Sequence, residues 1–299
     1  MAKKKVFLTG GWGFVLSNFA EQSGEKYELF RPTKEQLDLT DASAVEKYVK
    51  EHDFDVVIHG ANVGGTRNTA HLKDTVEENL KCFFNVARCN KHFGKMIQLG
   101  SGAEYDKSRA IVRVKEGEFD LRVPGDNYGF YKYVCSKYLP SQENITCLRL
   151  FGCYGKYEDY SIRFISNAIC RSLYGLPIVV ANQNVRFSYI FIEDFARVLQ
   201  HFVDHDAKHR FYNAVPDEVC DLVSIGGTIN KAAGRKGAVV VKKPGMGNEY
   251  SADNSLLKEE IPSFKFTPLE HGIGKLYRWY AQKKEKGELD LSKIKLEGE

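Results

Sequence analysis

Tyr128 and Lys132 are the two residues whose types and spacing most directly suggest chemistry. They lie four residues apart in a stretch without proline that can form a helix, so both side chains should project from one helix face. A tyrosine hydroxyl, with an ordinary pKa of about 10, exchanges protons poorly near neutrality, but a nearby ammonium group lowers that pKa. Lys132 can supply this charge. Taken alone, the motif is more simply interpreted as a helix with an ordinary surface lysine.

Ser101 is a second candidate for chemistry. It follows the apolar residues 96–99, which predict a strand, and ligands bind at the carboxyl ends of strands in open parallel sheets. By itself a serine at this point is more often an ordinary loop residue. Upstream of Tyr128 and Lys132, it becomes a candidate hydrogen-bond donor to a carbonyl oxygen.

A glycine-rich loop follows the first apolar run, residues 6–8. Gly10 and Gly13 have the spacing of a dinucleotide-binding turn, in which backbone N–H groups and a helix dipole face a pyrophosphate. Such a loop is weak evidence alone, and its place at the first strand-to-helix turn strengthens it. Leu16 stands where a third glycine would allow the helix to pack closely on the strand, so we expect a slightly displaced helix.

Arg31 follows the second expected strand, residues 27–30. An acidic residue at this position binds the ribose 2′-hydroxyl of NAD, whereas a cation suits the 2′-phosphate of NADP. With Lys34 nearby, Arg31 favours NADP(H) over NAD(H). The alternative interpretation of Arg31 is a solvated loop charge.

The composition is that of an ordinary globular protein: 299 residues, 43% hydrophobic and 27% charged, with a formal net charge of +4. This small net charge gives no reason to expect nucleic acid as a partner. Seven scattered cysteines without a CxxC pair predict reduced thiols used mainly as small core residues, and they argue against zinc and disulfides. No apolar run approaches 18 residues, so we expect a cytoplasmic protein without a membrane partner.

Alternating strand and helix patterns over the first half predict an α/β fold with a doubly wound parallel sheet of the Rossmann type. A third strand is expected at residues 37–41 and a buried one at residues 55–58. The buried strand leads to Gly60 and Ala61, whose small side chains would let the chain pass close to a cofactor. A helix ends with His201, His205 and His209, and this spacing is interpreted as a solvated helix end rather than a metal site.

Several motifs occur in an order that resembles a known family. They are TGGxGF after the first strand, HGAN at residues 59–62, Ser101, and Tyr128 with Lys132. Together they are similar to the extended short-chain dehydrogenase/reductase family, the NAD(P)-dependent nucleotide-sugar epimerases, dehydratases and reductases. Residues 149–155 resemble its R-x-x-N-x-Y-G motif, with glycine in place of asparagine, and residues 191–196 resemble Y-V-x-D-x-A. Within the family, residues 31–41 and 62–65 look most like the GDP-L-fucose synthases.

The departures from the family pattern concern its acids and bases. Fucose synthases epimerise C3 and C5 with a cysteine and a histidine, and the matching positions here are Ala103 and Tyr157. Dehydratases carry Asp-Glu after the hydroxyl residue, where this chain has Gly102 and Ala103. The resemblance therefore implies a reductase that retains only the hydride and proton machinery.

In that implied 4-keto reductase, Ser101 and Tyr128 hydrogen-bond the C4 carbonyl oxygen, NADPH delivers hydride to C4, and Tyr128 gives the proton. Lys132 holds the nicotinamide ribose and keeps the pKa of Tyr128 low. The implied substrate is a GDP-linked 4-keto-6-deoxyhexose or 4-keto-heptose, as in bacterial capsule pathways. The implied cofactor-binding residues are Gly10, Gly13, Phe14, Val15, Arg31, Asp38, Leu39, Gly60, Ala61 and Lys132. The implied substrate-binding residues are Asn79, Arg163 and Arg186, the last lying one residue further from Asp194 than in the family.

The resemblance also implies an organisation. Residues 1–155, rejoined by residues 185–215, are expected to form the NADP-binding domain, and residues 156–184 and 216–282 a smaller nucleotide-sugar-binding region. Residues 283–299 are charged and predict a mobile tail. A homodimer through the Tyr128 helix and the helix around Asn79 is expected. The alternatives are a C4-epimerase that retains NAD, an epimerase/reductase of the fucose synthase type, and a degenerate scaffold protein.

Overall fold

A six-stranded parallel sheet forms the centre of the larger part of the molecule in the computed structural model, which describes residues 2–64 and 74–294. The strand order is β11-β6-β4-β3-β1-β2, and every neighbouring pair is parallel. This order is doubly wound, which confirms the predicted Rossmann-type fold. The strands are β1 (Lys5–Thr9), β2 (Glu28–Phe30), β3 (Phe54–His59), β4 (Phe93–Ser101), β6 (Ile145–Leu150) and β11 (Phe211–Asn213).

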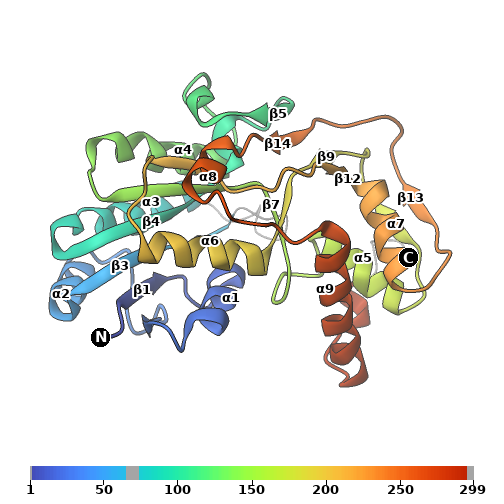
Figure 1. The fold of residues 1–299 in the computed structure, drawn as a ribbon, viewed down its shortest axis with the longest axis horizontal. Coiled ribbons are helices and arrows are strands. Elements are labelled where there is room, and N and C mark those ends of the chain that lie inside the picture. Colours follow the sequence, from blue (N-terminus) through green and yellow to red (C-terminus); the bar gives the residue numbers. More distant parts are fainter. Residues whose placement is uncertain (1, 65–73, 295–299) are drawn as a thin grey trace.

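Helices cover both faces of this sheet (Figure 1). One face carries α1 (Phe14–Ser23) and α6 (Ile192–Asp204), and the other carries α2 (Ala42–His52), α3 (Thr75–Ala87) and α4 (Asn127–Tyr138). Successive residues of β1 point to opposite faces of the sheet. Val6 packs against α1 and α6, and Phe7 packs against α2 and α3. Because both faces are covered, the strands are apolar almost throughout.

The third strand expected at residues 37–41 is wrong, because these residues form turns. The carboxylate Oδ1 of Asp38 accepts hydrogen bonds from the backbone N and the Oγ1 of Thr40, at 2.9 and 2.8 Å. Such local side-chain bonds compete with strand pairing. The cap predicted at the end of this segment is confirmed, since Asp41 accepts from the backbone N–H groups of Ser43 and Ala44 at the start of α2.

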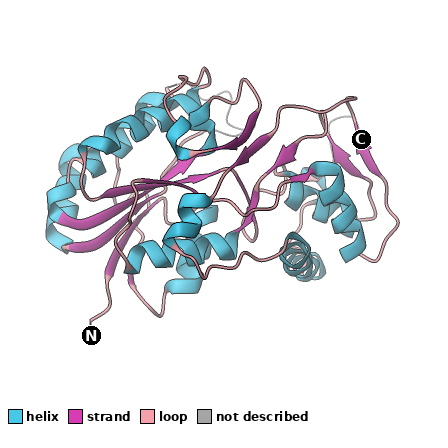
Figure 2. Ribbon diagram, turned by 45° about the horizontal axis from the view of Figure 1, so that its top comes forward, coloured by secondary structure: helices cyan, strands magenta, loops and turns pink. Residues whose placement is uncertain are grey.

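A second core lies beside the main sheet, among α5 (Phe164–Leu173), α7 (Leu222–Ala232) and α9 (Leu269–Glu285). Figures 1 and 2 show these helices on one side of the molecule, with short strands between them and the main sheet. The remaining elements are β5 (Ile111–Val114), β7 (Gly152–Tyr154), β8 (Ile178–Val180), β9 (Arg186–Phe187), β10 (Tyr189–Phe191), β12 (Cys220–Asp221), β13 (Val239–Val241), β14 (Tyr250–Ala252) and α8 (Ser255–Glu260). The domain boundaries inferred from the sequence stay a proposal.

The mobile tail expected at residues 283–299 is wrong for its described part, residues 283–294. Helix α9 continues to Glu285, and Leu289 and Ile294 are buried in the second core. The hydroxyl of Tyr174 also donates a 3.3 Å hydrogen bond to the carbonyl of Leu289. The charged composition misled the prediction because two well-spaced apolar residues are enough to dock a segment on a core that already exists. Residues 295–299 lie outside the described residues.

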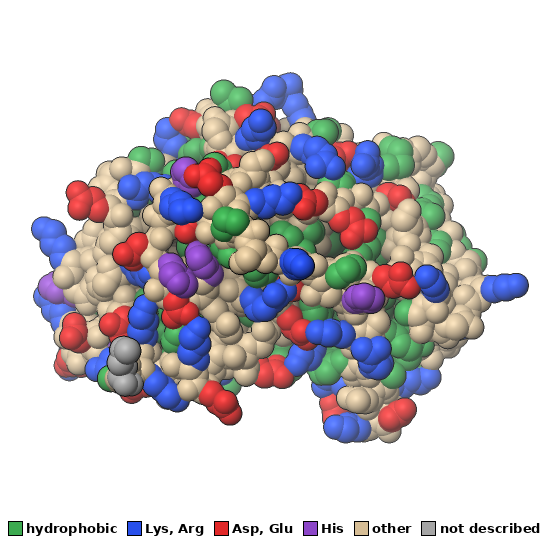
Figure 3. Space-filling view, viewed as in Figure 1, with side chains coloured by type: hydrophobic (Ala, Val, Ile, Leu, Met, Phe, Trp, Pro, Cys, Tyr) green, Lys and Arg blue, Asp and Glu red, His purple; other side chains and the backbone are tan. Residues whose placement is uncertain are grey.

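Other expectations from composition can be compared with the structure. The seven cysteines are free thiols and five of them are buried, which confirms their predicted use as small core residues. Figure 3 shows acidic and basic side chains interspersed over one face. In the described part of the chain, no helix has the length and apolar character needed to cross a membrane. His201 and His209 face the carboxylates of Glu260 and Glu259, each at 3.3 Å.

Candidate active site

The turn between β1 and α1 has the backbone shape that a pyrophosphate site needs. Gly10 has φ +66°, and a Cβ there would lie only 2.7 Å from the Cα of Ala61. Gly13 is the N-cap residue of α1, without a side-chain cap, and the first turn of the helix holds no acidic residue. The N–H groups at the start of α1 are therefore open to an anion, in a favourable helix dipole.

Leu16 and Gly60 explain the departure from the glycine pattern. The side chain of Leu16 is buried, and its Cδ1 would lie 2.8 Å from a Cβ added to Gly60. The missing third glycine of the loop is thus compensated by a glycine at the end of the adjacent strand β3. Helix α1 can pack closely on the sheet because Gly60, which has no side chain, leaves room for Leu16.

A cavity of about 410 Å³ lies over this turn. Asn62 lines it, and Asn62 also lines a second cavity of about 570 Å³, so the two are neighbours. The hydroxyl of Tyr131 on α4 donates a hydrogen bond to Asn62 Oδ1, which fixes this side chain. Of the predicted cofactor-binding residues, the first cavity is lined by Gly10, Gly13, Asp38, Leu39 and Ala61, and the second by Phe14 and Val15.

Arg31 does not line the first cavity, but it contacts Gly11 and Trp12, which do. Its guanidinium stacks 4.0 Å from the ring of Trp12 and donates to the carbonyl of Gly11 at 3.0 and 2.6 Å. Trp12 returns a 2.9 Å bond from its indole N–H to the carbonyl of Arg31. Lys34, which lines the cavity, is 3.1 Å from Glu78. Two cations are therefore close together here: Lys34 in the cavity wall, and Arg31 beside it, oriented by an aromatic ring.

Ser101 lies at the carboxyl end of β4, and it lines the second cavity. Its Oγ accepts a 3.1 Å hydrogen bond from the backbone N–H of Ala103, so its own proton is available to a ligand. In return, Glu104 Oε1 accepts from the backbone N–H of Ser101 at 2.8 Å. This capping box fixes the serine side chain at the cavity wall.

Glu104 is a site residue that sequence reasoning missed. Its Oε2 accepts from the Oγ of Ser136 on α4 and from the Nε of Arg149 on β6, both at 2.7 Å. The side chains of Glu104 and Arg149 are completely buried. Glu104 thus ties the Ser101 strand to the helix that carries Tyr128. The S-x-x-E spacing of residues 101–104 was a visible signal, since it is the pattern of a capping box.

Tyr128 and Lys132 project from the first turns of α4, as the spacing predicted. Tyr128 is half-buried and lines the second cavity, and the Nζ of Lys107 lies 5.5 Å from its ring centroid. Lys132 is 5% exposed, and its Nζ donates a 2.6 Å hydrogen bond to the carbonyl of Leu99 on β4. Lys132 is therefore not an ordinary surface residue. A buried ammonium group costs free energy unless it is hydrogen-bonded, as it is here to the carbonyl of Leu99.

Of the predicted substrate-binding arginines, one lines the second cavity and the other does not. Arg163 precedes α5 and lines the second cavity. Arg186 does not line it, whereas its neighbours Val185 and Phe187 do, and its guanidinium is 3.7 Å from Glu249. Successive strand residues point to opposite faces, so Arg186 is turned away by its place in β9.

Asn79 requires a correction, because it is 2% exposed and holds a loop. Its Nδ2 donates to the carbonyls of Val63 and Thr75, at 2.7 and 2.6 Å, and its Oδ1 accepts from the N–H of Val63 at 2.9 Å. With these bonds made, the side chain is not available to a sugar. Asn79 instead positions the segment after Asn62. Gly65, which the family motif includes, lies outside the described residues.

The positions matched to the family's acids and bases carry no such group into the cavity. Ala103 lines the second cavity, whereas Tyr157 lies outside it, with its hydroxyl 3.2 Å from Glu21 and its ring against Trp279. Gly152, where the family has asparagine, is explained by packing: a Cβ there would lie 2.5 Å from the ring of Tyr189.

The doubly wound sheet with a glycine turn at the start of α1 defines a protein of the Rossmann class. Residues 6–214 match the NAD dependent epimerase/dehydratase family, and the chain belongs to this family. This finding confirms the resemblance drawn from the motifs.

Three similar proteins illustrate the range of the family. GDP-L-colitose synthase of Yersinia pseudotuberculosis is 24% identical over 94% of this chain and 99% of its own length. The structure of a GDP-mannoheptose C4 reductase from Campylobacter jejuni with NADP bound has a TM-score of 0.78 and 22% identity, covering 94% of this chain and 99% of that one. A UDP-glucose 4-epimerase from Thermotoga maritima has a TM-score of 0.80 and 18% identity, covering 94% and 99%. At these identities the two structures show a shared fold.

Proposed function

We propose that this protein reduces the C4 keto group of a nucleotide-activated sugar with NADPH. The observation that carries the proposal is the pairing of cavities: Ser101 and Tyr128 line one, and it meets the dinucleotide cavity at Asn62. Ala103 and Tyr157, at the epimerase positions, place neither acid nor base in the substrate cavity. A site of this kind retains what a carbonyl reduction needs.

The residues of the chain have separate tasks in this reaction. Ser101 donates a hydrogen bond to the keto oxygen, because its Oγ already accepts one from Ala103 and keeps its proton for the ligand. Tyr128 gives the proton that the reduced oxygen takes up. Lys132, whose Nζ donates a hydrogen bond to the carbonyl of Leu99, would hold the nicotinamide ribose.

The open helix start and the close backbone approach at Gly10 support a dinucleotide in the first cavity. The phosphates would lie at Gly10 and Gly13, and the adenosine between Asp38, Leu39 and Ala61. When bound, the nicotinamide supplies a hydride. Arg31, stacked on Trp12, and Lys34 favour the 2′-phosphate of NADP over the bare hydroxyl of NAD.

A GDP-linked 4-keto-6-deoxyhexose or 4-keto-heptose is the substrate class we propose. It is supported by the names of the similar proteins, a GDP-colitose synthase and a GDP-mannoheptose reductase. The substrate cavity also carries the cations a diphosphate needs, Lys107, Arg109 and Arg163. These cations do not distinguish the base of the nucleotide.

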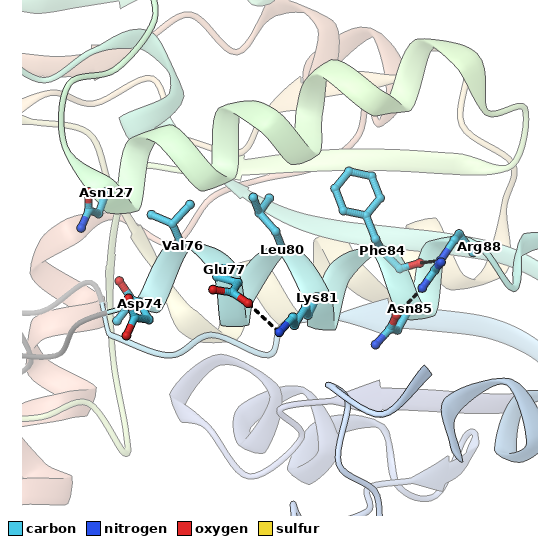
Figure 4. A pocket seen from close by; sticks show the side chains of 10 residues that line it. Asp74, Val76, Glu77, Leu80, Lys81, Phe84, Asn85, Arg88 and Asn127 are labelled. Atoms are coloured by element: carbon cyan, nitrogen blue, oxygen red, sulfur yellow. Dashed lines mark hydrogen bonds and ion pairs between the residues drawn. The ribbon is translucent and has the colours of Figure 1, made fainter. Parts of the chain in front are cut away.

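We also propose a homodimer through α3 and α4. A groove of about 820 Å³ runs along α3, and Figure 4 shows Val76, Leu80 and Phe84 pointing toward α4. Glu77 and Glu78 lie in the first turn of α3, and Arg88 is the C-cap residue at its other end. A two-fold axis would set α3 antiparallel to its copy and bring opposite charges together.

Light scattering should give twice the monomer mass for the wild type and one monomer mass for Leu80→Arg. A dimeric Leu80→Arg, or a monomeric wild type, would reject this interface.

The test of the activity is NADPH absorbance during incubation with a GDP-4-keto-6-deoxy sugar and a GDP-4-keto-heptose, in deuterated water. We expect oxidation of NADPH with one of them and no deuterium at C3 or C5 by NMR. Deuterium at either carbon would show that a group in the cavity deprotonates the sugar, which contradicts a dedicated reductase. Stoichiometric NAD in the purified protein, without net NADPH oxidation, would instead indicate a C4-epimerase.

A further inference from the structure

Glu158 is a buried carboxyl in the wall of the substrate cavity. It follows β7, is 7% exposed, and lines the same cavity as Ser101 and Tyr128. Its Oε2 accepts a 2.5 Å hydrogen bond from the Oγ of Ser166 on α5. Among the described residues, its Oε1 has no hydrogen-bond partner. This oxygen is not among the fully buried side-chain atoms that lack a partner, so it is accessible from the cavity and can form a hydrogen bond with a ligand.

The backbone turns Glu158 inward. Tyr157 has φ +70°, a left-handed conformation, and its side chain lies outside the cavity. Glu158 is then fixed by its own backbone: its N–H donates to the carbonyl of Gly155 and its carbonyl accepts from the hydroxyl of Tyr280, each at 3.4 Å. The resemblance to the fucose synthases matches an epimerase acid to Tyr157, but the fold presents the next side chain to the cavity.

An aromatic wall connects Glu158 with the keto-binding end of the cavity. Tyr250 lies close to Ser101, its ring centroid is 5.5 Å from that of Phe187, and the ring centroid of Phe187 is 5.2 Å from that of Tyr189. All three rings line the cavity, and Tyr189 lies close to Glu158. A sugar ring offers apolar C–H groups to such a wall and hydroxyl groups to its polar ends.

We propose that Glu158 recognises the sugar: its Oε1 hydrogen-bonds a hydroxyl group of the sugar while Ser101 and Tyr128 hold the keto oxygen. This inference rests on the proposed function, because it requires a nucleotide sugar in the cavity. Truncating a side chain that binds a ligand hydroxyl removes one hydrogen bond and leaves the nucleotide contacts in place.

The charge of Glu158 follows from its surroundings. Burial raises its pKa to about 8, against the opposing hydrogen bond from Ser166 and the attraction of Arg163. The carboxyl is therefore mostly protonated at pH 7, and in that form it can donate to the sugar as well as accept from it. The titratable groups that face it are Arg163 and Asp159 of its own loop, Cys153 of β7, Tyr189 of β10 and Tyr280 of α9.

Calorimetric titration with GDP and with GDP-mannose, in the presence of NADP, tests this assignment without turnover. In Glu158→Ala we expect the preference for GDP-mannose over GDP to fall about tenfold, and the affinity for GDP to stay within about twofold. Glu158→Gln keeps a donor and an acceptor at the same place and should retain most of the preference. Asp159→Asn changes the adjacent carboxylate, which is exposed and outside the cavity, and should bind as the wild type does.

Three results would overturn the proposal, and they separate its causes. A Glu158→Ala variant with the wild-type preference for GDP-mannose would reject sugar recognition alone. So would a loss of equal size for GDP and GDP-mannose, since that is the effect of a merely structural residue. If the wild type binds neither compound, the GDP-sugar function fails with it. Should Glu158→Ala not fold, pH decides: the wild-type preference should fall between pH 7 and pH 9, and that of Glu158→Gln should stay constant.

Discussion

The cofactor region and the substrate region of this protein are built in different ways. The proposed cofactor region comes mainly from residues 7–39 and 61–63, which follow adjacent strands of one sheet, with Glu78 and Cys82 of α3 at its side. The substrate region gathers residues from β4, α4, β7, α5, β9, β10 and the segment before β14. A local motif dictates the first region, whereas the second depends on how distant segments pack.

This difference determines what a substitution should do. In the cofactor region the backbone itself forms the site, so changes should act through φ angles and close contacts. In the substrate region side chains form the site, and buried polar networks hold them in place. Substitutions in each region can therefore confirm or break the comparison.

The largest effect is expected for Tyr128→Phe, which removes the proton donor. Turnover of NADPH with a keto sugar should fall about 10³-fold, since general acid catalysis contributes about 10² to 10⁴. The affinity for NADPH, measured by fluorescence titration, should hardly change. Tyr138→Phe is the matched control on the same helix, because Tyr138 packs on Phe84 outside the cavity. An active Tyr128→Phe would reject the mechanism.

Glu104→Gln should have the next largest effect, because it leaves Arg149 buried without a charged partner. Breaking a buried ion pair costs about 3 to 5 kcal/mol, and urea unfolding measures this loss. The rate of turnover should also fall, since Glu104 holds Ser101. The control is Glu21→Gln, whose surface pair with Lys156 is worth less than about 1 kcal/mol. Equal stability of the two variants would show that the buried network does not hold the site.

Gly10→Ala tests the backbone-built region. It adds a Cβ beside Ala61 at a positive φ, and strain of about 1 to 3 kcal/mol should weaken NADPH binding about 10 to 100-fold. Gly234→Ala is a matched control, since Gly234 has φ +62° with nothing within 4 Å of an added Cβ. Both variants should lose some stability by thermal unfolding, but only the first should lose cofactor affinity. Similar binding losses would mean that positive φ alone, rather than the close approach, matters.

The smallest effect is expected for Arg31→Ala. Loss of one charge-assisted contact should raise the KM for NADPH about tenfold and leave that for NADH unchanged. Arg197→Ala serves as the control, because Arg197 also stacks on an aromatic ring, 4.6 Å from Phe264, away from both cavities. A rise in KM for both cofactors would indicate that Arg31 supports the loop rather than the 2′-phosphate.

Much of the cofactor region could be read from the sequence because its residues are neighbours in the chain. The glycine turn, the apolar strands and the Tyr128 to Lys132 spacing are local patterns with a local physical meaning. One error arose where alternating apolar residues predicted a strand at residues 37–41 that the structure does not form. Leu37 and Leu39 look like strand residues, but Asp38 bonds Thr40 and closes a turn instead. Likewise, Leu289 and Ile294 are buried in the second core, although the charged residues around them predicted an exposed segment.

The sequence by itself determined the fold class and the glycine turn, and it provided the proposed set of Ser101, Tyr128 and Lys132, because spacing along a strand or helix fixes which side chains share a face. Only the tertiary structure decided the rest. It buried Glu104 among Ser101, Ser136 and Arg149, packed Leu16 against Gly60, and turned Glu158 rather than Tyr157 into the second cavity. These contacts join residues far apart in the chain or depend on one backbone angle, and neither leaves a periodic signal in the sequence.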